Sequence, residues 1–186
     1  MAGYTHVALL LAAGSGRRMG GVVDDKLTVR LQGHSVFARN LLAFEAAGFI
    51  DRYVVVYRDA EQRACLESSI PADLHESCRI EWVAGGAERQ DSVYAGLQSI
   101  NAPCDFVHIH DCARPMVQPD ALRAVQQSVE VDQASVLAHA VVDTIKRISE
   151  AGKLRQNELE DLERPRLWAM ETPQAFAWPR ILNAYE

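Results

Sequence analysis

Short apolar segments alternate with segments of helical periodicity along most of this sequence, and that alternation constrains the fold more than any other feature. The apolar segments are rich in Val, Ile and aromatic residues, as buried strands are, and cover residues 6–12, 53–57, 80–83, 106–109 and 135–142. Apolar residues at helical spacing predict helices at residues 36–47, 60–67, 92–100 and 119–129. This order favours an α/β fold, a three-layer and mostly parallel Rossmann-like sheet with helices on both faces.

Parallel sheets of this kind bind ligands beyond the carboxyl ends of their strands. Three loops follow expected strands, at residues 14–26, 85–91 and 111–115. We therefore expect these loops to lie on one shared rim of the sheet.

The first of these loops combines small residues with cationic side chains. It belongs to the stretch VALLLAAGSGRRMGGVVDDK, residues 7–26, where an uncharged apolar run leads into the small residues Ala12, Ala13, Gly14, Ser15 and Gly16. Small residues let backbone N–H groups approach a polyphosphate closely. Arg17, Arg18 and Lys26 add positive charge, and cations gathered in one loop repel one another unless an anion lies among them. The loop therefore predicts nucleotide chemistry.

Two common phosphate motifs are excluded for this loop. No Gly-Lys-Ser or Gly-Lys-Thr follows, so it is not a P-loop. The third glycine of a dinucleotide fingerprint would fall at position 19, which is Met19. That residue, and the basic side chains where an acidic ribose-binding residue is needed, disfavour a nicotinamide-dependent oxidoreductase. The structural alternative for the glycines alone is a tight strand-to-helix turn.

Composition excludes several other classes of protein. The 186 residues, 48% of them hydrophobic, suffice for one domain with a single core. A net charge of −6 argues against general nucleic-acid binding. No apolar segment approaches the roughly 20 residues of a membrane span and no charged leader begins the sequence, so a cytoplasmic location is expected. The four cysteines form no CxxC pair, which favours buried or partly buried thiols in a reducing compartment.

Residues 143–165, DTIKRISEAGKLRQNELEDLERP, differ in amino-acid composition from the rest of the sequence. The segment is charged and poor in large apolar residues. It is expected to leave the domain, either as a hairpin-like arm or as a flexible loop.

Motifs spread over nearly the whole sequence resemble those of one enzyme family. LLLAAGSGRRMG followed by a lysine is similar to the signature of sugar-nucleotide-transferase-like nucleotidyltransferases. Further segments resemble GG-x-x-R-x-x-S-V, HD-x-ARP, DT-x-K-R and LW…TPQ-x-F, and they occur at residues 85–93, 110–115, 143–147 and 167–176. Their order and spacing resemble the 2-C-methyl-D-erythritol 4-phosphate cytidylyltransferase family of the non-mevalonate isoprenoid pathway.

The resemblance implies that an acceptor phosphate attacks the α-phosphorus of CTP and that pyrophosphate leaves. Arg18 and Lys26 match the family's catalytic cations, which act with Mg²⁺ or another divalent cation. A phosphate monoester has its second pKa near 6 and is already largely a dianion at pH 7, so no general base is needed. His108 and His110 are therefore interpreted as strand-end residues rather than as a catalytic base or zinc ligands.

The resemblance also implies a nucleotide site on the expected rim. Its residues are Ala12, Ala13, Gly14, Gly16, Gly86, Arg89, Ser92 and Asp111. Asp111 can hold the metal ion or a substrate hydroxyl, and Arg114 is interpreted as a structural residue that pairs with Asp111 or with a neighbouring carboxylate. Ala87 departs from the family pattern, because an acidic residue is common there.

In the family, the segment after DT-x-K-R is an arm that embraces a second subunit. Here it corresponds to about residues 143–165 of a single nucleotidyltransferase domain spanning residues 1–186. Arg164 matches an arginine that reaches the partner's substrate, so a homodimer with active sites completed in trans is expected. Thr144 and Thr172 match acceptor-binding positions, as does Asp111.

Some features keep other functions open. The family continues beyond TPQ-x-F to an acceptor-binding lysine, whereas this sequence ends at Glu186 within an expected helix. A non-catalytic nucleotide-binding module is therefore an alternative. Ribitol 5-phosphate cytidylyltransferase shares the fold and CTP site, although AAG at residues 12–14, HDCARP and IKR fit the methylerythritol branch better.

Overall fold

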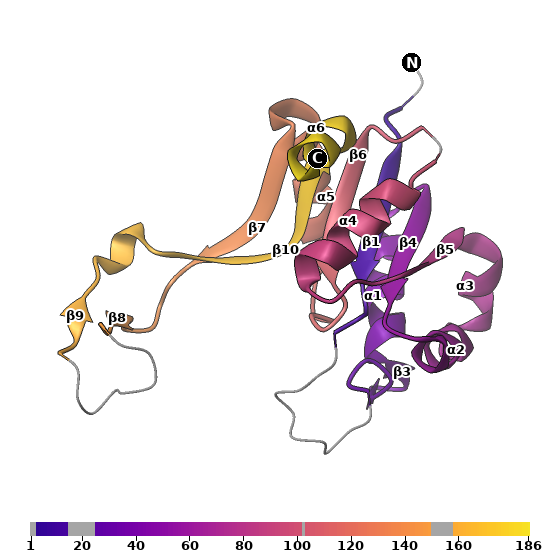
Figure 1. The fold of residues 1–186 in the computed structure, drawn as a ribbon, viewed down its shortest axis with the longest axis horizontal. Coiled ribbons are helices and arrows are strands. Elements are labelled where there is room, and N and C mark those ends of the chain that lie inside the picture. Colours follow the sequence, from indigo (N-terminus) through magenta and orange to yellow (C-terminus); the bar gives the residue numbers. More distant parts are fainter. Residues whose placement is uncertain (1–2, 15–24, 102, 150–157) are drawn as a thin grey trace. The chain divides into compact units, whose positions relative to one another are not determined.

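The computed structural model describes residues 3–14, 25–101, 103–149 and 158–186. The chain divides into two compact units, one formed by Met1–Val136 with Thr172–Glu186 and the other by Leu137–Glu171. A six-stranded sheet has the strand order β5-β4-β1-β6-β10-β7 (Figure 1). Its strands are β1 (His6–Leu11), β4 (Arg52–Tyr57), β5 (Ile80–Ala84), β6 (Phe106–Asp111), β7 (Ala134–Ala140) and β10 (Trp168–Ala177).

The centre of this sheet is parallel. Strand β1 pairs in parallel with both β4 and β6, and β4 pairs in parallel with β5. The carboxyl ends of these four strands therefore share one rim, as expected. Strand β10 runs antiparallel to β6, with Gln174 opposite Ile109, so the sheet is mostly parallel rather than wholly so.

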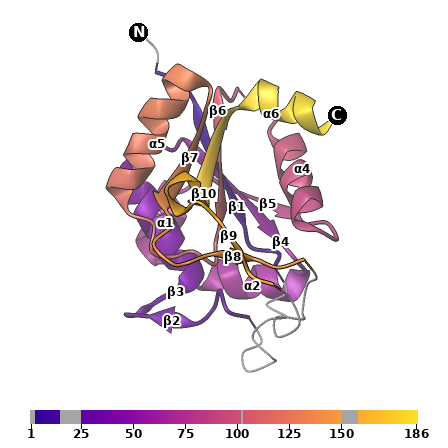
Figure 2. The ribbon, with the colours of Figure 1, turned by 90° about the vertical axis from the view of Figure 1, so that its left-hand side faces the viewer.

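Helices cover both faces of the sheet (Figure 2). Helices α1 (Val36–Ala47), α2 (Ala60–Ser68), α3 (Ala72–Ser77) and α5 (Pro119–Asp132) bury residues in one hydrophobic cluster. Helices α4 (Arg89–Ser99) and α6 (Trp178–Tyr185) pack in the cluster on the other face. Successive side chains of a strand point to opposite faces, and β1 accordingly places Leu10 in the first cluster and Leu9 in the second.

The sequence prediction found every expected strand and helix, with α1 at its observed bounds, while most other boundaries differ by one to three residues. Helix α4 begins at Arg89 rather than at residue 92. The N–H of Glu88 donates to Asp91 Oδ2 at 2.9 Å, and this reciprocal cap starts the helix earlier. Strand β7 ends at Ala140, two residues before the expected end.

Some elements were not predicted. They are helix α3, strand β10 and a hairpin of β2 (Arg30–Leu31) and β3 (His34–Ser35). The hairpin turns through Gln32 and Gly33, whose φ values of 49° and 89° are both positive, as a tight two-residue turn requires.

The second unit contains the charged segment 143–165. Within it β8 (Lys146–Arg147) pairs antiparallel with β9 (Glu160–Asp161). Ion pairs join Lys146 to Asp161 and Arg147 to Glu160. A 3-10 turn, η3 (Arg164–Arg166), follows. This strand pairing favours the hairpin interpretation over the flexible loop, and a role of the segment in dimerisation stays a prediction.

Burial of the cysteines agrees with expectation except at one position. Cys78, Cys104 and Cys112 are buried, and desolvation raises the pKa of the Cys104 thiol to about 12. Cys65 lies on the outer side of α2 and is exposed, so the expectation of a buried or partly buried thiol is wrong there. In the part of the chain that the structure describes, no helix is both long enough and apolar enough to cross a bilayer.

Candidate nucleotide site

At the rim, the residues that follow β1 and β5 both form hydrogen bonds to β4, the strand between them. The N–H of Ala12 donates to Val56 O at 2.8 Å, and the N–H of Gly85 donates to Tyr57 O at 2.7 Å. Both bonds continue the strand pairing one residue beyond the strands. The small residues of the first loop and the glycine pair of the second are thereby brought together, as the motif analysis expected.

The glycine pair is required by the packing of this rim. A Cβ at Gly85 would lie 2.7 Å from Ala13 Cβ and 2.9 Å from Ser92 Oγ, and a Cβ at Gly86 would lie 2.3 Å from Asp91 Cβ. Such distances are too short for carbon atoms without a shift of the chain. Ser92 is buried, and its Oγ accepts a hydrogen bond from the N–H of Gly86 at 3.1 Å. Ala13 and the first turns of α4 therefore constrain the conformation of the glycine pair.

Asp111 ends β6 and forms an ion pair at the rim. Arg89 Nε and Nη2 both lie 3.0 Å from Asp111 Oδ1, while Arg114 Nε lies 4.0 Å from Oδ2. The expected Arg114 partnership is present. Sequence reasoning assigned Arg89 to the nucleotide segment but missed its pairing with Asp111.

Beneath Asp111 a buried hydrogen-bond chain begins at Asn40 of α1. Asn40 Nδ2 donates to Val36 O and to Cys112 O, each at 2.8 Å, which directs Oδ1 toward His110. His110 Nε2 lies 2.8 Å from that oxygen and must carry the hydrogen. His110 Nδ1 is then an acceptor for the hydroxyl of Thr172, at 3.0 Å.

The same hydroxyl oxygen reaches the end of β6. The N–H of Asp111 donates to Thr172 Oγ1 at 3.3 Å, so Thr172 ties β10 to the residue that carries the rim carboxylate. Burial lowers the pKa of His110 to about 4, which keeps the imidazole neutral near pH 7. The interaction of Thr172 with His110 is long-range in sequence and was not predicted.

His108 is likewise buried, in the middle of β6 rather than at its end as expected. Its Nε2 lies 3.1 Å from His6 Nδ1, and burial lowers the pKa of His108 to about 3. Neither His108 nor His110 is exposed to solvent. Both side chains are therefore poorly placed to exchange protons with a substrate.

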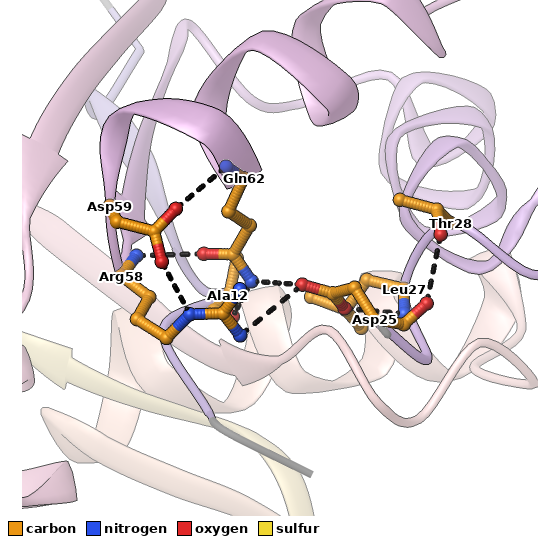
Figure 3. Close-up of polar contacts among 7 residues, drawn as sticks. All are labelled: Ala12, Asp25, Leu27, Thr28, Arg58, Asp59 and Gln62. Atoms are coloured by element: carbon orange, nitrogen blue, oxygen red, sulfur yellow. Dashed lines mark hydrogen bonds and ion pairs between the residues drawn. The ribbon is translucent and has the colours of Figure 1, made fainter. Parts of the chain in front are cut away.

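Lys26 follows directly on a carboxylate that is engaged in several bonds (Figure 3). Asp25 Oδ1 accepts from the N–H of Leu27 at 2.9 Å, and Oδ2 accepts from Gln62 Nε2 at 2.5 Å. Lys26 itself is partly buried. Gly16, Arg17 and Arg18 lie outside the described residues, so their predicted roles are not placed.

The remaining acceptor-binding candidates fall in different units. Thr172 belongs to the first unit, whereas Thr144 and Arg164 belong to the second. Both residues of the second unit are exposed, and Arg164 Nη1 donates to Val142 O at 3.2 Å.

Comparison of this chain with known proteins identifies its family. The family model of 2-C-methyl-D-erythritol 4-phosphate cytidylyltransferase matches residues 6–186. A protein of that name from Symbiobacterium thermophilum is 38% identical over 174 residues, which cover 94% of this chain and 69% of the relative. One from Clostridioides difficile is 36% identical over 184 residues, covering 97% of this chain and 73% of the relative.

Solved structures show the same fold. The crystal structure of 4-diphosphocytidyl-2C-methyl-D-erythritol synthase from Anaerococcus prevotii has a TM-score of 0.79 and is 22% identical, covering 98% of this chain and 74% of that one. The cytidylyltransferase structure from Thermus thermophilus has a TM-score of 0.70 at 23% identity, covering 97% of this chain and 76% of that one. Fold, motifs and sequence match agree, and this chain belongs to the 2-C-methyl-D-erythritol 4-phosphate cytidylyltransferase family.

Proposed function

We propose that this chain transfers the cytidylyl group of CTP to 2-C-methyl-D-erythritol 4-phosphate. An oxygen of the acceptor phosphate forms a bond to the α-phosphorus, the bond from that phosphorus to the oxygen of the β-phosphate breaks, and pyrophosphate leaves. The product is 4-diphosphocytidyl-2-C-methyl-D-erythritol. The observation that carries the proposal is the family match over residues 6–186, which spans every rim motif.

Cationic side chains supply the main catalytic effect in this proposal. The attacking phosphate is already largely dianionic near pH 7, so activation by a base is unnecessary. Negative charge instead gathers around the attacked phosphorus and the departing pyrophosphate, where fixed positive charge lowers the barrier. Lys26 and Arg18 are assigned to this task. The neutral, buried state of His108 and His110 supports a reaction without histidine acid or base.

The nucleotide is assigned to the loops after β1 and β5. Ala13, Gly14 and Gly16 approach the triphosphate, and Gly86 and Ser92 approach the cytosine. Ser92 Oγ already accepts a hydrogen bond from the N–H of Gly86, so its hydroxyl would act as a donor toward the base. Ala12 is buried with both its backbone groups bonded inside the protein, so it forms the base of this site.

A divalent cation, with Mg²⁺ the family's expected ion, fits the rim through Asp111. The described residues contain no cluster of three or more His, Cys, Asp or Glu side chains that could hold a metal ion. Mg²⁺ commonly binds through one or two carboxylates together with substrate phosphates, and the partly exposed Asp111 meets that requirement. Such an ion would neutralise phosphate charge. Arg89 holds the carboxylate ready at the rim, with its Nε 3.0 Å from Asp111 Oδ1.

The acceptor is assigned to Asp111, Thr172, Thr144 and Arg164, with Arg164 supplied by a second copy of the chain. The hairpin of β8 and β9 and the exposed position of Arg164 are consistent with a segment that meets another subunit. The proposed assembly is therefore a homodimer with each site completed in trans.

Pyrophosphate release tests the proposal directly. The full chain should release pyrophosphate from CTP with methylerythritol phosphate and far more slowly with ribitol 5-phosphate. Lys26→Ala should lower turnover by about 10²- to 10³-fold, the loss typical for one preorganised charge donor. Arg180→Ala, an exposed cation on α6, is the matched control and should leave turnover unchanged. Full activity in Lys26→Ala would refute the assigned role of Lys26.

A further inference from the structure

Gln62 occupies an unusual position for a glutamine, because it is 2% exposed and every hydrogen-bonding group of its amide is used. Nε2 donates to Ala12 O at 2.9 Å and to Asp25 Oδ2 at 2.5 Å. Oε1 accepts from the N–H of Arg58 at 2.7 Å. Figure 3 shows the amide between the end of β1 and the residue that precedes Lys26.

We propose that Gln62 is a positioning residue for Lys26, an inference that rests on the proposed function of that lysine. The amide joins a rigid element, the carboxyl end of β1, to the side chain of Asp25, the residue directly before Lys26. A carboxamide suits this place because Ala12 O and Asp25 Oδ2 are both acceptors and need two N–H donors. A glutamate has the same shape, but it would place a carboxylate oxygen, which cannot donate, next to these two acceptor oxygens.

The glutamine is itself held firmly. Asp59 caps helix α2, its Oδ1 accepting the N–H of Gln62 at 2.8 Å. Arg58 lies alongside, with Nε 2.7 Å from Asp59 Oδ2 and Nη1 3.6 Å from Asp25 Oδ2. The start of α2 therefore presents the amide in one orientation.

The backbone on each side of Lys26 is fixed as well. Asp25 O accepts from Thr28 Oγ1 at 2.8 Å, and Leu27, 1% exposed, packs in the core cluster of α1. Leu27 O accepts the N–H of Phe37 at 3.0 Å. Lys26 is thus a partly buried cation between two anchored residues, and the Gln62 contact ties it to β1.

Gln62 has a second consequence for charge. A free carboxylate next to Lys26 would compete with phosphate for the ammonium group. Asp25 instead has its oxygens taken by Leu27 N–H, Gln62 and Arg58, and its side chain is 10% exposed. Loss of Gln62 would release a competitor for the cation as well as loosen its backbone.

The test is a mutational cycle on the full chain, measured by pyrophosphate release. Gln62→Glu should lower kcat/KM for CTP by about ten- to a hundredfold, since small misplacements of catalytic groups have effects of this size. Gln98→Glu, an exposed glutamine on α4, is the matched control and should change it less than about twofold. If Gln62→Glu does not fold, Gln62→Met keeps the length, removes both donors and carries the same expectation.

The cycle with Lys26 separates positioning from a general structural effect. In a Lys26→Ala background, Gln62→Glu should change the remaining rate by less than about twofold, because Gln62 acts through that lysine. The charge-conserving pair Gln62→Glu with Asp25→Asn should recover part of the loss, because the carboxamide introduced at position 25 can donate to the carboxylate introduced at position 62. Equal losses with and without Lys26, or no recovery in the pair, would overturn the inference.

The outcomes also distinguish this inference from the proposed function. Full activity in Lys26→Ala would remove the assigned role of Lys26 and the inference with it. A severe loss in Lys26→Ala together with wild-type kinetics in Gln62→Glu would overturn the positioning role alone.

Discussion

His110 Nδ1 lies 3.0 Å from Thr172 Oγ1, so a neutral histidine in β6 accepts a hydrogen bond from the hydroxyl group of a threonine in β10. The orientation follows from Asn40, whose Oδ1 requires the hydrogen on His110 Nε2. Thr172 Oγ1 in turn accepts the N–H of Asp111. The hydroxyl hydrogen of Thr172 is therefore already used in a hydrogen bond inside the protein. Toward a hydroxyl group of the substrate, Thr172 can accept a hydrogen bond but cannot donate one.

Replacement of Thr172 should test this arrangement. Thr172→Val keeps the shape but leaves His110 Nδ1 and the N–H of Asp111 without their partner, and unpaired buried groups cost about 1–3 kcal/mol. The free energy of unfolding, measured with urea, should fall by that amount. Thr172→Ser keeps the hydroxyl and should stay within about 1 kcal/mol of wild type, the value of one methyl group. Equal stability of the valine and serine variants would contradict the assigned bond.

Acidification should destabilise the protein between about pH 6.5 and pH 4. Burial lowers the pKa of His110 to about 4 and of His108 to about 3 from an ordinary value of 6.5, and burial also lowers the pKa of His6. In that range the unfolded chain binds protons that the folded protein excludes, so the free energy of unfolding rises with pH. The contribution of these histidines reaches its full value above pH 6.5. Each fully buried histidine contributes a slope of about 1.4 kcal/mol per pH unit.

Urea unfolding at several pH values between 5 and 8 measures this slope. His110→Gln should reduce the slope, because the unfolded chain then binds one proton fewer relative to the folded protein. His34→Gln, which changes an exposed histidine of β3, should leave the slope as it is. A stability that does not change between pH 7 and pH 5 would show that these histidines are protonated in the folded state.

The elements of the fold were largely predictable because their signals are local. Strand β1 and helix α1 each carry a continuous apolar pattern that is readable within a dozen residues. Strand β10 was missed because its sequence, WAMETPQAFA, contains a proline and lacks clear alternation. The start of α4 at Arg89 could have been found, since Glu88 and Asp91 have the spacing of a reciprocal cap.

The contacts of the site were less predictable, because they join residues distant in sequence. Motif resemblance brought Arg89, Asp111 and Ser92 to one rim, but it did not say which of them bond. Gln62 contacts Asp25 across 37 positions and Thr172 contacts His110 across 62, and neither pair has a local pattern. Such pairs depend on how α2 and β10 pack against the sheet.

Gly85→Ala should disturb both stability and nucleotide binding. Its Cβ would lie 2.7 Å from Ala13 Cβ and 3.2 Å from Tyr57 O, a backbone atom that cannot yield without moving β4. Overpacking of this kind costs about 1–3 kcal/mol, and the KM for CTP should rise because the loop shifts. Gly14→Ala is the stability control, because a Cβ there meets no atom of the described residues within 4 Å. Unfolding midpoints that are equal for the two variants would contradict the packing argument.

Mixing two inactive variants should restore activity if the proposed dimer completes its sites in trans. Lys26→Ala and Arg164→Ala should each be poorly active alone, because each removes a cation assigned to every site. In a mixed dimer, one site combines the intact Lys26 of one subunit with the intact Arg164 of the other. Random exchange makes about half of the dimers mixed, so roughly a quarter of wild-type pyrophosphate release should return. Sedimentation must confirm that subunits exchange, and exchange without regained activity would mean that Lys26 and Arg164 serve the same subunit's site.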